Sequence, residues 1–226
     1  MLERSGKTQA GKTARPRSRA GERADERRGR ILDVAIRLAE DGGFDNVRQR
    51  DVAVQAGVAL GTLYKSFRGK EDLLSAALQR ETDLLERRMK QRPTRGETAH
   101  ARVTALFDTL TRTLCKKPNY ARAVIKAMAS GEPETAANVI AYQTQVHRMV
   151  LFALRGPSHE EPDAAASEEE LTVSMLLQQI WFATLVGWTA ALFDEAAAIA
   201  QVSVAARLLL AGAKAERDAT ARAPRR

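Results

Sequence analysis

The chain has 226 residues, of which 44% are hydrophobic and 28% are charged, and its net charge is +8. This length has room for one large domain or two small ones, with enough apolar material for a core. Helix-forming Ala, Leu, Arg and Glu dominate, and no bounded run of alternating β-branched or aromatic residues predicts a strand. The composition therefore predicts an all-α fold. The single cysteine, Cys115, excludes an internal disulfide and is interpreted as a small buried hydrophobic residue.

The positive charge is concentrated at the start of the chain. Residues 1–30 carry ten Lys or Arg side chains against four acidic ones. We expect residues 1–24 to form a disordered basic arm that can neutralise the phosphates of a polyanion, or else a solubilising tail. No apolar stretch follows the basic start, so we expect no signal peptide and a cytoplasmic location.

The stretch "GKTQAGKT", residues 6–13, fits the pattern of a phosphate-binding loop. Such a loop must lie between a strand and a helix so that its backbone N–H groups converge on the phosphates. No strand-like segment precedes Gly6, whereas Pro16 and several arginines follow Thr13. The tripeptide G-K-T occurs twice, and this repeat accounts for the match. A nucleotide hydrolase is therefore a disfavoured alternative.

The first helix is expected to begin near Asp25. Its apolar residues recur at helical spacing between Ile31 and Ala39, and Gly42 and Gly43 are expected to end it.

Two short helices are predicted to follow, over residues 48–56 and 60–67. Gly57 supplies the left-handed residue that the tight turn between them needs. Val52, Leu63 and Phe67 would form their shared core. This arrangement is a helix-turn-helix, whose second helix can enter the major groove of DNA.

From about residue 27 to 78 the chain resembles the TetR family of bacterial transcriptional regulators. The resemblance is carried by Phe44, Arg50-Asp51-Val52-Ala53, Ala56-Gly57-Val58, Gly61-Thr62-Leu63-Tyr64, Phe67 and Lys70-Glu71-Asp72-Leu73. The sequence departs from the family's pattern at four positions. Val47 stands where a capping Thr or Ser is usual, Ala59 and Leu60 replace Ser-Lys, and Ser66 replaces His or Tyr.

The resemblance implies a set of DNA contacts. Thr62, Tyr64 and Lys70 would touch backbone phosphates, and Gly61 would let the second helix approach closely. Base edges would be read by Arg48, Gln49 and Lys65, because Arg and Lys suit guanine and Gln suits adenine. Arg50 would pair with a phosphate or with Asp51. The candidate DNA-binding residues are Arg48, Gln49, Arg50, Ala59, Gly61, Thr62, Tyr64, Lys65 and Lys70.

Further helices are predicted beyond this region, separated by Pro- and Gly-containing breaks. They cover residues 70–91, 98–117, 119–130, 134–154 and 198–212, together with the apolar segment 171–193, which Ser167 and Glu170 open at capping-box spacing. Asn119 is expected to cap the 119–130 helix. The segment 155–166 is polar and is expected to form an exposed loop.

The segment 171–193 carries no charge and is long enough to be considered as a membrane span. Six polar side chains and the lack of flanking charge asymmetry argue against that reading. A helix that is apolar all round can instead be buried between its own domain and a second subunit. The last two helices therefore predict a homodimeric four-helix bundle, as the resemblance also implies, bound to an inverted-repeat operator in double-stranded DNA.

The family resemblance also implies a small-molecule pocket in the C-terminal part of the chain. The candidate lining residues are Phe107, Met128, Tyr142, Met149, Trp181 and Phe182, although such residues are also typical of plain core. We find no cluster of charged pocket residues, which favours an apolar effector, and a weaker similarity to repressors of steroid and lipid catabolism agrees. The expected domains are residues 25–78, which bind DNA, and 79–214, which bind the effector and dimerise, with a disordered tail at 215–226.

Enzymatic function is not expected. The three histidines, His100, His147 and His159, are far apart without metal-ligand spacing, and Cys115 belongs to no nucleophile motif. No metal and no cofactor is therefore expected. The sequence predicts a ligand-released repressor, with a ligand-independent architectural DNA-binding protein as the alternative.

Overall fold

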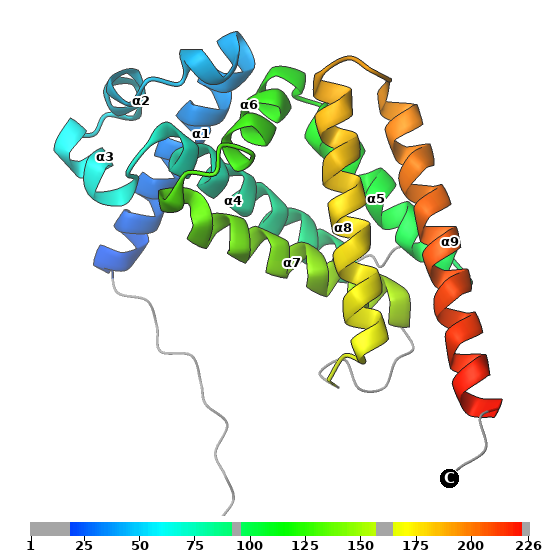
Figure 1. Cartoon of the computed structure of the whole chain (residues 1–226). Coiled ribbons are helices and arrows are strands. Elements are labelled where there is room, and N and C mark those ends of the chain that lie inside the picture. The colour runs from blue at the N-terminus through cyan, green and yellow to red at the C-terminus, as the bar shows by residue number, and fades with distance from the viewer. Residues whose placement is uncertain (1–18, 92–95, 157–164, 223–226) are drawn as a thin grey trace, which may run out of the picture.

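The computed structural model describes residues 19–91, 96–156 and 165–222, and every regular element in these ranges is a helix (Figure 1). The "GKTQAGKT" stretch and residues 1–18 of the expected arm lie outside the described residues. The elements are α1 (Arg19–Asn46), α2 (Gln49–Ala56), α3 (Leu60–Ser66), α4 (Lys70–Gln91), α5 (Ala99–Cys115), α6 (Pro118–Met128), a 3-10 turn η1 (Pro133–Thr135), α7 (Ala136–Arg155), α8 (Glu168–Thr189) and α9 (Glu195–Arg222).

Helix α1 begins at Arg19, earlier than the expected start at Asp25. Residues 19–24 include good helix formers, and Glu22 in the first turn interacts favourably with the helix dipole, so charge alone did not prevent helix formation. The expected stop at two glycines is confirmed. Gly42 (φ −150°) and Gly43 (φ 71°) are non-helical and kink the chain before α2.

Helix α6 starts differently from the prediction. Pro118 occupies its first turn, and Asn119 does not cap the helix but donates its side-chain N–H to the Glu40 carbonyl oxygen of α1, at 2.9 Å. The Glu40 carboxylate in turn accepts from the backbone N–H of Tyr120, at 3.0 Å. A backbone N–H at the start of α6 is thus satisfied by Glu40 of α1. Glu40 lies eighty positions before Tyr120, so the local sequence could not identify it as the partner.

The capping box expected at the start of α8 is confirmed. The Ser167 hydroxyl accepts from the Glu170 backbone N–H at 3.2 Å, and the Glu170 carboxylate accepts from the Ser167 N–H at 2.9 Å. Helix α9 is longer than expected, because Gly212 does not end it and it continues to Arg222. The prediction of a disordered tail at 215–226 is therefore wrong for residues 215–222, which are helical. Residues 213–222 are mostly Ala and charged helix formers and contain no Gly or Pro.

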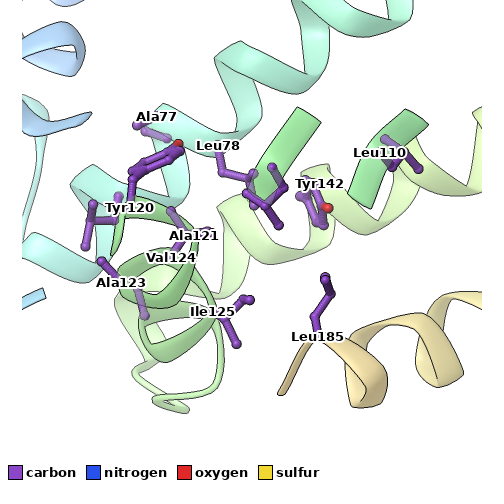
Figure 2. Close-up of a cluster of buried hydrophobic side chains, with 14 of the residues drawn as sticks. Ala77, Leu78, Leu110, Tyr120, Ala121, Ala123, Val124, Ile125, Tyr142 and Leu185 are labelled. Atoms are coloured by element: carbon purple, nitrogen blue, oxygen red, sulfur yellow. The ribbon is translucent and has the colours of Figure 1, made fainter. Parts of the chain in front are cut away.

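Helices α1 to α3 form one end of the molecule, and α8 and α9 lie side by side at the other (Figure 1). Helix α4 leads from the first group to the second, and α6 packs against both α1 and α4. Figure 2 shows Tyr120, Ala123 and Val124 of α6 among buried side chains that include Ala77 of α4 and Tyr142 of α7. The core therefore runs without interruption from the first helices into the C-terminal ones, with α6 at the junction.

Candidate nucleic-acid interface and adjoining pocket

The turn between α2 and α3 has the predicted geometry. Gly57 lies in the left-handed region (φ 65°, ψ 42°), where a residue without Cβ is favoured, and the Val58 N–H donates to the Ala53 carbonyl oxygen at 3.0 Å. Val52, Leu63 and Phe67 are buried beneath the turn. Their burial fixes the angle between the two helices and leaves the outer face of α3 to solvent.

That outer face carries most of the predicted DNA-binding side chains. Tyr64 is 51% exposed although it is a large aromatic residue, and Thr62 beside it is half-buried. The remaining exposed members of the set are Arg48, Arg50, Ala59, Gly61 and Lys65. Exposed cations and hydroxyl groups on a helix-turn-helix are suited to phosphate and base contacts.

Gln49 has an internal role that the sequence did not reveal. Its side-chain N–H donates to the Phe67 carbonyl oxygen at 3.2 Å, which ties the start of α2 to the end of α3. Val47 is buried in the core and does not occupy the capping position, which belongs to Arg48. Neither Arg48 nor Ala59 makes a side-chain cap, so both short helices depend on packing and on bonds such as that of Gln49.

Gly61 is not required by the packing of the protein itself. A Cβ atom built at this position would meet no other atom within 4 Å, and Gly61 lies in the first turn of α3 on the exposed face. Glycine lowers helix stability, so its presence here costs stability that no internal contact explains. Close approach of an external surface is one requirement that only glycine meets.

Lys70, at the start of α4, lies in a cluster with three other side chains. Its Nζ lies 3.5 Å from Asp45 Oδ1 and 3.9 Å from the centre of the Phe44 ring. Lys126 of α6 approaches the same two residues, 3.6 Å from Asp45 Oδ2 and 4.4 Å from the ring centre. The end of α1, beyond its kink, is thereby joined to α4 and to α6 by two ion pairs and two cation–π contacts.

A pocket of about 460 Å³ lies between the end of α6, α7 and α8. Four of the predicted ligand-binding residues line it, namely Met128, Tyr142, Trp181 and Phe182. Val139 and Met175 add to the apolar wall. The polar lining residues are Gln143, Thr144, His147, Gln178 and Gln179. Their sequence pattern does not mark them as pocket residues, because polar residues on a helix are usually solvated. No lining residue is Asp, Glu, Lys or Arg.

The two other predicted lining residues do not reach this pocket. Phe107 is 1% exposed and packs against Trp181, with ring centres 5.5 Å apart, while Met149 is buried on α7. Trp181 is held from behind, because its Nε1–H donates to the buried Thr111 hydroxyl at 2.9 Å. Phe107 and Met149 are therefore core residues. This was the other interpretation of aromatic and Met residues at helical spacing.

Helices α8 and α9 each expose apolar side chains at helical spacing, four or eleven residues apart. On α8 the row contains Leu171, Met175 and Val186, and on α9 it contains Val204 and Leu208. Both helices are long and apolar enough to cross a membrane by length and composition, and most of the residues in their apolar stretches are not buried. They also pack against each other, and α9 packs on α5. In the part of the chain that the structure describes, no group of acidic, His or Cys side chains could hold a metal ion.

Comparison with known proteins agrees with this geometry. Residues 31–77 match the family model "Bacterial regulatory proteins, tetR family", and residues 96–209 match "Tetracyclin repressor-like, C-terminal domain". The HTH-type transcriptional repressor KstR of Rhodococcus jostii (strain RHA1) is 35% identical over 165 residues, covering 72% of this chain and 73% of that protein.

Two solved structures share the fold. A TetR transcriptional regulator from Rhodococcus sp. RHA1 superposes with a TM-score of 0.74 at 26% identity, covering 83% of this chain and 97% of that one. FadR from Bacillus subtilis, solved in complex with stearoyl-CoA, gives a TM-score of 0.57 at 18% identity, covering 81% and 98%. With both family models matched in order, the chain belongs to the TetR family and is a DNA-binding transcriptional repressor with a helix-turn-helix and a C-terminal ligand-binding domain.

Proposed function

We propose that this repressor binds an inverted-repeat operator as a homodimer and is released from it by an apolar, lipid- or steroid-like effector that occupies the pocket between α6, α7 and α8. The protein would act in the cytoplasm, where its DNA is. The observation that carries the proposal is the position of α6, which lines the pocket at one end and is bonded to the DNA-binding part at both ends.

Three contacts define that position. At its start α6 is bonded to Glu40 of α1, and near its end Lys126 is paired with Asp45. Met128, two residues beyond Lys126, lines the pocket. A ligand against Met128 can therefore shift a helix whose partners include Lys70, through Asp45. Release requires that the ligand bind one arrangement of these helices better than the other.

The lining supports an apolar effector, since it combines aromatic and Met side chains with neutral polar groups. The binding of stearoyl-CoA is a property of the B. subtilis protein. At 18% identity to this chain, that structure supports the shared fold alone. The proposal of an apolar effector therefore rests on the pocket residues of this chain.

The dimer is supported by the exposed rows on α8 and α9. Around Val204 and Leu208 the exposed positions of α9 include Ala200, Ala211 and Gly212, small residues that permit close helix packing. A second copy placed on this surface would bury it in a four-helix bundle, and the twofold axis would present two α3 helices to successive major grooves. Burial of this kind also explains, without a membrane, why residues 171–193 carry no charge and residues 196–213 carry one, Arg207.

The proposal is tested by measuring a reciprocal effect. If the ligand releases DNA, bound DNA must weaken ligand binding by the same factor. The neutral dye N-phenyl-1-naphthylamine would be titrated into free protein and into protein saturated with an operator duplex. We expect weaker dye binding in the complex. Equal dye affinity in both states would instead support the ligand-independent architectural alternative.

A further inference from the structure

His147 is the polar residue of the pocket with a fully buried partner. Its Nδ1 lies 2.7 Å from the hydroxyl oxygen of Ser174 on α8, and Ser174 is 0% exposed. His147 lines the pocket and is only half-buried, whereas Ser174 is not among the lining residues. The serine therefore bonds Nδ1 from outside the lining, and among the described residues Nε2 has no hydrogen-bond partner.

The partner determines which ring nitrogen carries the proton. A buried hydroxyl needs an acceptor for its hydrogen, and among the described residues the bond to His147 is the one that Ser174 makes with its side chain. If the serine donates, Nδ1 accepts, and the neutral ring bears its hydrogen on Nε2. Burial lowers the pKa of His147, which favours this neutral form. Nε2–H is then an unused hydrogen-bond donor on a residue that lines the pocket.

The other polar lining groups differ from His147. Gln178, with its amide oriented to satisfy both ends, bonds the α7 backbone at Gln143 and His147. Gln143, Thr144 and Gln179 are exposed, so none of them is held in one orientation by burial. The Tyr142 hydroxyl can donate or accept, and burial raises its pKa, so it remains protonated. His147 is thus the polar lining residue whose buried partner fixes a hydrogen-bond donor, Nε2–H.

We propose that His147, positioned by Ser174, donates a hydrogen bond from Nε2 to a carbonyl oxygen of the effector. This deepens the proposed function of the pocket and rests on it. A neutral donor in a wall without Asp, Glu, Lys or Arg suits a neutral acceptor, such as the carbonyl of a ketone, an ester or a thioester on an otherwise apolar body. A hydrocarbon of the same shape fills the same space but leaves this donor without a partner.

The experiment uses two probes that differ at one group. Octanophenone has a carbonyl where octylbenzene has a methylene. Each would displace N-phenyl-1-naphthylamine from the full-length protein, and the preference is the ratio of their two dissociation constants. We expect His147→Phe to reduce the preference for the ketone by about fivefold to tenfold, the effect of one hydrogen bond, with octylbenzene binding nearly unchanged.

Four further variants separate a positioning role from a structural one. His147→Gln keeps a donor and should retain part of the preference. Ser174→Ala should reduce the preference while the protein still melts cooperatively, because the ring loses the bond that fixes its tautomer. Thr144→Val and Tyr142→Phe remove the other hydroxyls and should leave the preference as in wild type.

The possible failures are distinguishable. A preference unchanged in His147→Phe, or one that is lost instead in Tyr142→Phe or Thr144→Val, would overturn the assignment of His147 while leaving the pocket intact. Failure of the dye to bind the wild-type protein at all would overturn the ligand pocket itself, and with it this inference.

Discussion

Lys70 Nζ lies 3.5 Å from Asp45 Oδ1, so a lysine proposed to bind DNA phosphate is paired with a carboxylate of its own chain. The same carboxylate holds Lys126 of α6, at 3.6 Å. Asp45 is 82% exposed, so these pairs lie in high dielectric and contribute little to stability. Asp45 instead lowers the positive charge beside the proposed DNA surface and holds Lys70 and Lys126 near each other.

Replacing Asp45 by Asn should therefore tighten DNA binding by about threefold to tenfold at moderate salt, because one negative charge is removed next to the phosphates. Lys70→Ala should weaken binding and reduce the slope of log affinity against log salt by about one. Both effects would be measured by fluorescence anisotropy over a salt series. Lys116→Ala, an exposed lysine at the end of α5, is the control. Equal effects of Lys70 and Lys116 would show that the lysine at α4 has no special role.

Gly61→Ala should separate DNA binding from stability. The protein leaves open space around a Cβ at this position, and Ala favours a helix by up to about 1 kcal/mol over Gly, so the melting temperature should stay or rise. DNA affinity should nevertheless fall by more than tenfold if the glycine lets DNA approach closely.

Gly57→Ala provides the comparison. Its positive φ of 65° strains any residue with a Cβ, so this variant should lose about 1 kcal/mol of stability. Unchanged DNA affinity in Gly61→Ala would remove the argument that this residue faces the operator.

Thr111→Val should destabilise the fold by about 1–3 kcal/mol, because the Trp181 Nε1–H would be left buried without an acceptor in a side chain of similar shape. Thr111 is 1% exposed, whereas Thr113 on the same helix is exposed, so Thr113→Val is the matched control. Urea unfolding followed by tryptophan fluorescence would measure both. A loss no larger than that of the control would mean that the bond has no net stabilising effect.

The start of α8 should make stability depend on pH. The hydrogen bonds from the Arg155 guanidinium lower the pKa of Glu170 from 4.5 to about 2. Because the folded pKa is depressed, the stabilisation is present above about pH 4.5 and is lost as the pH falls towards 2.

Glu170→Gln should thus lower the melting temperature at pH 7, and the difference from wild type should shrink on acidification. Glu168→Gln, in the same first turn but exposed, should show a smaller difference that changes less with pH. A constant gap between wild type and Glu170→Gln from pH 7 to pH 3 would contradict the assigned pairing.

Local patterns in the sequence predicted the elements that depend on neighbouring residues. The turn at Gly57, the break at Gly42 and Gly43 and the capping box at Ser167 all follow from residue type at fixed spacing, and each was confirmed. The helix expected over residues 70–91 from the breaks beside it is likewise confirmed as α4. Periodicity is a reliable guide where the residues that satisfy one another are close in sequence.

Contacts between distant segments were not predictable in this way. Glu40 replaces Asn119 at the start of α6, and Gln49 bonds the end of α3, in both cases through atoms that no local pattern links. The lining of the pocket was predicted only in part. Side-chain size and hydrophobicity suggested Trp181 and Phe107 equally. Only the fold shows that one lines the space and the other lies behind it.

Whether the repressor binds an inverted repeat as a dimer is tested by selecting random duplex DNA with the purified full-length protein at physiological salt and measuring the stoichiometry of the selected complexes by native mass spectrometry. We expect enrichment of one inverted repeat bound by two chains, with half-sites about one helical turn apart, or a few base pairs more. Graded binding without an enriched motif, or one chain on an asymmetric site, would contradict it.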